Sequence, residues 1–360
     1  MKKKYVIVLS SIIMLSGLLF SLFFLNKEDK KPQPTTSFLK TITLNESICH
    51  ISDDDLGRIE GIQCNDSVLI TFDLHTGYTY TLFDLQTGTS LGRFGKIGQG
   101  PEEISAGCFG NLINNKYYIH SFADGLVAKY NTDSLTCNIN AKPIKMTRVK
   151  IPFGDIHFRR VIPLNDTTFL GAGTNITKQY TVFNHQDAII SSAVDVYNAN
   201  DNQFNKYQRA LSNTGVLRKH PTENKFAFAL SKSANIDFFD VVNNQIQPIK
   251  LIRERNPLLD IQQNSTLVTA SPNPTCPIGY LDVAVGDKYV YALYTEKKIT
   301  ASYNSDIIRV FDWKGNPIVQ YKLKDEAFYI AINEKAQKLY AVIRNSEGGY
   351  SITSYDIPVL

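Results

Sequence analysis

The feature that most constrains this sequence is a pattern of apolar β-type segments that recurs six times. One segment of the pattern begins at positions 67, 116, 167, 225, 288 and 338, so successive copies start 49 to 63 residues apart. The copies are short runs of aromatic, β-branched and aliphatic residues, such as KYYIHSF and KFAFAL. Because several strands fit into each period, the sequence predicts a repeat architecture.

Further strand-like segments surround the recurring one in most copies. One precedes it, as at 58–64 (RIEGIQC), and another follows after a turn, as at 80–88 (YTLFDLQTG). A last segment often comes next, as at 89–95 and 317–323. Four short antiparallel strands in each of six copies predict an all-β fold, a six-bladed β-propeller of four-stranded antiparallel blades.

The first strand-like segment belongs to no copy. Residues 38–44 (FLKTITL) alternate apolar and polar side chains, while the sixth copy reaches Leu360 without a fourth strand. Pairing the two would remove two exposed sheet edges. We therefore expect residues 38–44 to complete the last blade and close the ring. A β-sandwich followed by a second β domain is the alternative, but it does not explain six copies of one pattern.

The N-terminus predicts a membrane-targeting segment. Three lysines precede an uncharged apolar run at 5–25, whose 21 residues are enough to cross a bilayer as one helix. With the lysines on the cytoplasmic side, we expect residues 1–25 to be an anchor, 26–37 a tether and 38–360 the propeller. The propeller would then lie in the cell envelope, on the periplasmic side of the inner membrane. A cleaved signal peptide is the alternative for the first segment.

Charge and motif content limit the partners and the chemistry. The formal net charge is only +4 and no long basic run follows the N-terminus, so we expect no nucleic-acid partner. The five cysteines fit no zinc-binding spacing, and their odd number leaves at least one outside intrachain disulfides. No HExxH motif is present. We expect no catalytic residue, no metal and no cofactor.

The long connections between copies are the candidate binding loops. In a propeller each outermost strand ends on the face where the next innermost strand begins, so these connections gather around one mouth of the channel. We expect them at residues 95–105, 143–155, 197–214 and 251–276, and binding usually resides in such loops. The first is glycine-rich, and it is either a polar recognition loop or a clasp whose glycines serve turn geometry. It is not a P-loop, because no Gly-Lys-Ser/Thr follows.

Basic residues at 157–160 and 218–220 are expected at the starts of two inner strands. If they point inward, they make that end of the channel positive and attractive to a carboxylate, a phosphate or an acidic peptide. The alternative is that they are rim charges exposed to water. The candidate ligand-binding residues from the glycine-rich loop and from these strands are Lys96, Gln99, Glu102, Glu103, His157, Arg159, Arg160, Arg218 and His220.

Four segments also carry a resemblance to a known family: FGKIGQGPEE at 94–103, LDVAVGDKYVYALY at 281–294, IRVFDWKGNPIVQYKL at 308–323 and IAINEKAQKLYAV at 330–342. In these segments the chain resembles the Bacteroidetes-type, TolB-like six-bladed β-propeller proteins, many of which are predicted envelope lipoproteins. The resemblance covers about residues 38 to 360 and implies a propeller outside the inner membrane, with no established catalytic residues to carry over. The chain departs from it at Leu18, where the lipidated cysteine would stand, and at Glu102, where glycine is common.

Together these observations favour a binding role over an enzymatic one. We expect a cell-envelope protein that presents a loop-rich face to an envelope protein, a peptide or a small anionic ligand. The alternative is a metal-dependent hydrolase or lyase with its site in the central channel. The Arg and His residues expected at the inner strands disfavour a bound cation there.

Overall fold

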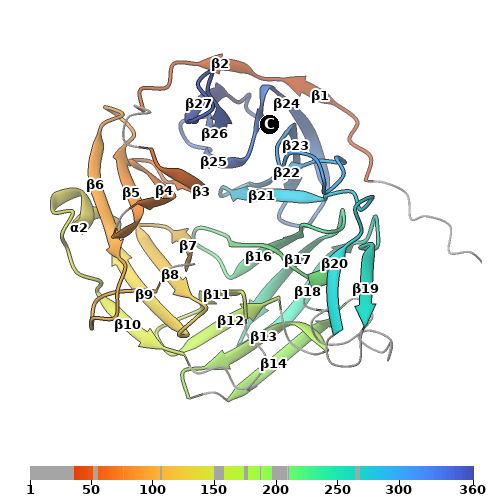
Figure 1. The fold of residues 1–360 in the computed structure, drawn as a ribbon, viewed down its shortest axis with the longest axis horizontal. Coiled ribbons are helices and arrows are strands. Elements are labelled where there is room, and N and C mark those ends of the chain that lie inside the picture. The colour runs from red at the N-terminus through yellow and green to blue at the C-terminus, as the bar shows by residue number, and fades with distance from the viewer. Residues whose placement is uncertain are drawn as a thin grey trace, which may run out of the picture. The chain divides into compact units, whose positions relative to one another are not determined.

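Six four-stranded antiparallel sheets surround a common centre, as Figure 1 shows. The structure is a computed structural model that describes residues 36–51, 56–75, 77–105, 108–149, 158–173, 177–186, 188–196, 209, 211–263 and 268–360. All of them belong to one compact unit, Thr36–Leu360. The expected six-bladed β-propeller is confirmed.

Each blade runs from an innermost strand to an outermost one in chain order. The strands of blades 1 to 3 are β3 (Arg58–Cys64), β4 (Val68–His75), β5 (Tyr78–Asp84), β6 (Ser90–Lys96), β7 (Cys108–Ile113), β8 (Lys116–Ser121), β9 (Leu126–Asn131), β10 (Lys145–Arg148), β11 (Arg160–Pro163), β12 (Thr168–Ala172), β13 (Lys178–Asn184) and β14 (Ile189–Asp195). A short helix, α2 (Thr132–Cys137), lies between β9 and β10.

Blades 4 to 6 follow the same order, and the N-terminal segment adds two short strands to them. Their strands are β15 (Gly215–Lys219), β16 (Lys225–Leu230), β17 (Ile236–Val242), β18 (Gln245–Ile252), β21 (Tyr280–Val285), β22 (Tyr289–Tyr294), β23 (Ser305–Asp312), β24 (Pro317–Ala327), β25 (Tyr329–Asn333), β26 (Lys338–Arg344) and β27 (Tyr350–Asp356), joined by β1 (Thr41–Thr43) and β2 (Asn45–Ser47).

The apolar core is divided among the interfaces between blades. Alternate side chains of a strand point to opposite faces of its sheet, and each face of a blade packs on a different neighbour. Tyr80 and Leu82 of β5 therefore pack with blade 2, whereas Phe83 packs with blade 6. Because both faces are covered, second strands such as β12, β16 and β22 are almost continuously buried, which is why the repeat is visible in the sequence.

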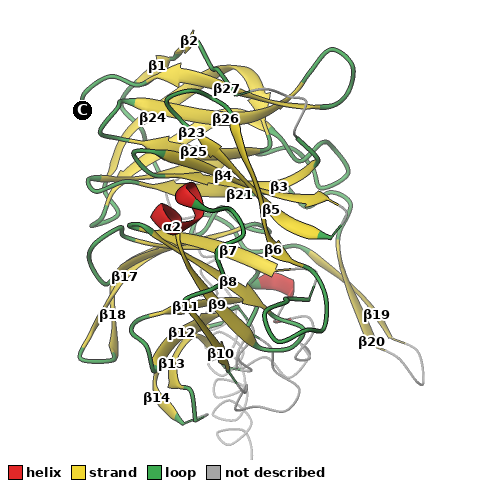
Figure 2. Cartoon of the chain, turned by 90° about the vertical axis from the view of Figure 1, so that its left-hand side faces the viewer, coloured by secondary structure: helices red, strands yellow, loops and turns green. Residues whose placement is uncertain are grey.

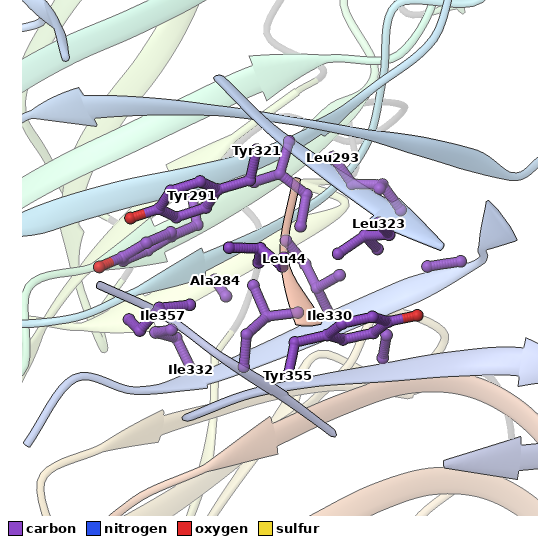
Figure 3. Packing of buried hydrophobic residues seen from close by; sticks show 14 of the residues in the cluster. Leu44, Ala284, Tyr291, Leu293, Tyr321, Leu323, Ile330, Ile332, Tyr355 and Ile357 are labelled. Carbon is purple, nitrogen blue, oxygen red and sulfur yellow. The ribbon is translucent and has the colours of Figure 1, made fainter. Parts of the chain in front are cut away.

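The N-terminal segment closes the ring, but not with the expected residues. β2 pairs antiparallel with β27 and completes blade 6, whereas β1 pairs in parallel with β24 on the outer edge of blade 5. The prediction that residues 38–44 complete the last blade is therefore wrong in its bounds. Leu44 is 3% exposed between blades 5 and 6, against Tyr321 and Tyr355 (Figure 3). At Leu44 the chain passes from blade 5 to blade 6. The residues before it pair with β24, and the three residues after it pair with β27.

Two of the predicted connections contain strands. Residues 143–155 include β10, and residues 251–276 include a hairpin, β19 (Leu259–Gln263) and β20 (Val268–Pro272), that extends away from the blades (Figure 2). The sequence pattern does not predict these strands, because an edge strand is held by backbone hydrogen bonds and needs little alternation of apolar and polar residues. Most of the connection at 197–214 lies outside the described residues.

The predicted anchor at 1–25 and nearly all of the tether lie outside the described residues. Within the described part of the chain, no helix is long and apolar enough to cross a membrane. Three of the cysteines, Cys64, Cys137 and Cys276, are free thiols.

Candidate functional site

A cavity of about 260 Å³ lies in the central channel, at the end where the inner strands begin. The innermost strands of all six blades line it, and we call it the axial pocket. Its side chains include Glu60, Phe72, Phe109, Arg160, Arg218, Leu281, Asp282 and Tyr329. It lies on the face from which the inter-blade connections enter the inner strands, as expected for a channel mouth.

Arg218 braces the channel. Its Nη2 lies 3.3 Å from Oδ1 of Asp282, and the two side chains are 11% and 5% exposed. Arg218 also donates from Nε to the carbonyl of Val283 at 2.8 Å, while Asp282 accepts from the backbone amides of Val283 and Ile330. These bonds connect β15, β21 and β25, so the charge of Arg218 is compensated within the fold.

Arg160 lies in the same pocket and is held by different contacts. It donates from Nε to the carbonyl of Gly215 at 3.2 Å, and its Cζ lies 3.5 Å from the centroid of the Phe109 ring. Among the described residues, no carboxylate forms an ion pair with it. Burial, and then the nearby charge of Arg218, lower the pKa of Arg160 to about 9, so it remains cationic at neutral pH. Within the part of the chain that the structure describes, this guanidinium therefore has no ion-pair partner, and the nearby charge of Asp282 compensates it only in part.

The other basic candidates do not reach this pocket. Arg159 is exposed, and His157 lies outside the described residues. His220 was expected at the start of an inner strand, but β15 ends at Lys219, so His220 belongs to the opposite end of the channel. There it is buried, with Nε2 3.0 Å from the carbonyl of Asp287 and Nδ1 accepting the backbone amides of the next turn. That turn, and not a channel site, accounts for its position.

The glycine-rich loop lies far from the axis, after the outermost strand of blade 1. Lys96, Glu102 and Glu103 line a second cavity of about 260 Å³ between blades 1 and 2, and Gln99 is exposed. Glu102 pairs with Lys142 at 2.9 Å. The loop therefore does not contribute to the axial pocket.

Glu103 holds the glycine-rich loop closed. Its carboxylate lies 2.6 Å from Nζ of Lys96 and accepts the amide of Gly100 at 2.8 Å. A Cβ added to Gly98 would come within 1.9 Å of the same carboxylate, so a larger residue there would displace the Glu103 side chain. The neighbouring Ile104 is 1% exposed in the interface core. These are the contacts of a clasp between blades.

Replacing Glu103 by alanine is therefore expected to loosen the loop selectively. Hydrogen exchange at the amides of Gly98 and Ile104, which are bonded across the loop, should rise about fivefold. The hydrogen bond from Lys96 lowers the pKa of Glu103, so in the wild type the clasp is lost only as pH falls through that lowered pKa. Glu102→Ala is the matched control, and equal exchange in both variants would contradict the clasp.

Sequence reasoning found the two arginines of the axial pocket but missed its aromatic wall. Phe109 lies on the inner strand β7, and Tyr329 begins the inner strand β25. Phe72 lies on a second strand and reaches the axis from there. For Phe109 and Tyr329 the sequence signal is their position near the start of a blade, whereas the sequence carries no such signal for Phe72.

Two further observations concern the channel. At its other end, the turns after the inner strands line a cavity of about 490 Å³ that includes Asn65, Asp287 and Lys335. Within the described ranges, no group of three or more His, Cys, Asp or Glu side chains is placed to hold a metal ion.

Comparison with known proteins agrees with this architecture. A putative exported protein of Bacteroides fragilis is 14% identical, with a TM-score of 0.56 over 90% of this chain and 98% of the other. A member of the DUF4221 family from Bacteroides vulgatus is 10% identical, with a TM-score of 0.50 over 87% and 94%. At such identities the likeness shows the fold alone.

Sequence comparison is informative at the level of the family. No curated protein matches the sequence. The model of the TolB-like 6-blade propeller-like family matches residues 61–335, which is most of the chain and includes strands of all six blades. The chain therefore belongs to the TolB-like 6-blade propeller-like family.

Proposed function

We propose that this protein is a non-enzymatic binding protein of the cell envelope. Its propeller presents the face of the inter-blade connections, with the axial pocket at its centre, to a peptide, a protein or a small anionic ligand. The observation that carries the proposal is the axial pocket itself, a channel mouth lined by the innermost strands of all six blades.

The position of the pocket supports a binding role for two reasons. Its walls are inner strands held by neighbouring blades, so a ligand would meet a preorganised site. Connections between blades lead into the inner strands on this face, and loops on a rigid scaffold are where binding usually resides. Apolar walls with a few convergent polar groups are also typical of ligand sites.

The envelope location is part of the proposal and depends on the N-terminal sequence. We propose that the apolar run at 5–25 tethers the propeller to the inner membrane on its periplasmic side, with export after cleavage as the alternative. A reporter that folds only outside the cytoplasm, fused after Leu360, is expected to be active. An inactive reporter in an otherwise expressed protein would contradict export.

To test binding, the purified full-length protein is incubated with an envelope extract of small molecules and peptides, and the retained compounds are identified. Leu281 lines the axial pocket and is part-buried, so Leu281→Trp should obstruct it. Leu251 is 40% exposed on the outer strand β18, which makes Leu251→Trp the matched control. Mass spectrometry should find at least one compound retained by the wild type and by Leu251→Trp but lost from Leu281→Trp. Identical profiles for all three proteins would contradict the proposal.

A further inference from the structure

We propose that the axial pocket binds an organic carboxylate with a compact apolar body, through a bidentate pair with the guanidinium of Arg160. This inference rests on the proposed binding function and names the chemical class of its ligand. The carboxylate could belong to a free acid or to the C-terminus of a peptide, since both present the same group.

The first argument is the balance of charge in the pocket. Four charged side chains line it: Glu60, Arg160, Arg218 and Asp282. Glu60 pairs with Nε of Arg58 at 2.8 Å, and Arg218 pairs with Asp282. Arg160 is left without a carboxylate among the described residues. A partly desolvated cation without a partner is costly, and an anionic ligand would remove that cost.

The second argument is the way Arg160 is held. The hydrogen bond from Nε to Gly215 and the stacking on Phe109 fix the plane of the guanidinium. Neither contact uses the terminal nitrogens Nη1 and Nη2, for which the described residues provide no acceptor. Two parallel N–H donors in a fixed plane match the two oxygens of a carboxylate.

The third argument is the rest of the lining. Phe72, Leu281 and Tyr329 supply apolar and aromatic surface next to the cation. Inorganic phosphate would leave that surface unused, whereas a ring or a branched chain would cover it. At about 260 Å³ the pocket suits one small molecule or the last side chain of a peptide.

Isothermal titration calorimetry on the purified full-length protein tests the assignment with four acids: acetate, 3-methylbutanoate, benzoate and phenylacetate. Phenylacetate is expected to bind at least about tenfold more tightly than phenylacetamide, its neutral analogue, and than inorganic phosphate. A peptide arm compares N-acetyl-Ala-Phe with its C-terminal amide. Tighter binding of the peptide acid than of phenylacetate would identify a peptide C-terminus as the source.

Two neighbouring arginines provide the matched variants. Arg160→Gln should weaken phenylacetate binding at least about tenfold, because it removes the charged donor pair. Arg159→Gln changes the adjacent, exposed arginine and should leave binding unchanged. Without ligand, Arg160→Gln should unfold at the same temperature as the wild type or higher, because an uncompensated cation has been removed.

Three results would overturn the proposal. The first is that none of the four acids binds. The second is that phenylacetate and phenylacetamide bind equally well. The third is a marked loss of thermal stability in ligand-free Arg160→Gln, which would show that Arg160 has a structural role. An envelope compound lost from Leu281→Trp but retained by Arg160→Gln would overturn the carboxylate and leave the binding function standing. Identical retention by wild type and Leu281→Trp would instead contradict the binding function itself.

Discussion

Replacing Arg309 by methionine is expected to lower the free energy of unfolding by about 3–5 kcal/mol. Nη1 of Arg309 on β23 lies 3.0 Å from Oε2 of Glu254, and the two side chains are only 7% and 3% exposed. The Cζ of Arg309 also lies 3.4 Å from the centroid of the Tyr294 ring. Methionine would fill much of the space but leave the Glu254 carboxylate buried without its cation. The unpaired buried charge accounts for most of the expected loss in the free energy of unfolding.

A double-mutant cycle measured by urea unfolding separates the charge from the packing. If the buried charge dominates, Glu254→Gln should recover much of the stability that Arg309→Met removes, because no unpaired ion then remains. Arg344→Met is the control, since Arg344 also lies over an aromatic ring, that of Tyr350, but is exposed. It should change stability by no more than about 0.5 kcal/mol. Additive effects of the two core substitutions would contradict the ion-pair argument.

Acidification from pH 7 to pH 4 is expected to remove about 3 kcal/mol of stability through His120 alone. The His120 side chain is 2% exposed, and its Nδ1 has no hydrogen-bond partner among the described residues. Burial, and then the charge of Arg160, lower the pKa of His120 from 6.5 to about 3, and the nearby Asp124 opposes them only in part. The unfolded chain therefore takes up a proton below pH 6.5 that the folded protein refuses until about pH 3, so stability falls as the pH falls.

His120→Leu removes this group and keeps a similar volume. Chemical unfolding of wild type and variant between pH 4 and pH 7 should give curves that diverge toward low pH, with the variant losing less stability. Carboxylates titrate in both proteins, so the difference isolates the histidine. His185→Leu, at an exposed histidine, should follow the wild type. Parallel curves for wild type and His120→Leu would show that His120 does not carry the acid sensitivity.

The fold was predictable because its signals are local and repeated. Buried second and third strands such as β4 and β5 pack on both faces, so their apolar residues recur visibly along the chain. Outer strands have one free edge, which is why β10 and the hairpin of β19 and β20 carried no comparable signal. The choice of β2 to close the ring follows from the burial of Leu44 between two blades.

The site depends on distances that the sequence does not contain. The sequence predicts basic residues near the axis and a loop at Glu103 that is either a recognition loop or a clasp. Only the tertiary structure places the loop of Glu103 at the rim as a clasp and Arg160 in the pocket. It also pairs Arg218 with Asp282, 64 residues away, whereas no described carboxylate forms an ion pair with Arg160. The six blades and the supply of charges follow from the pattern of residues along the chain. Which charge is available to a ligand was decided by the closure of the ring, because electrostatic compensation depends on separation in space and not along the chain.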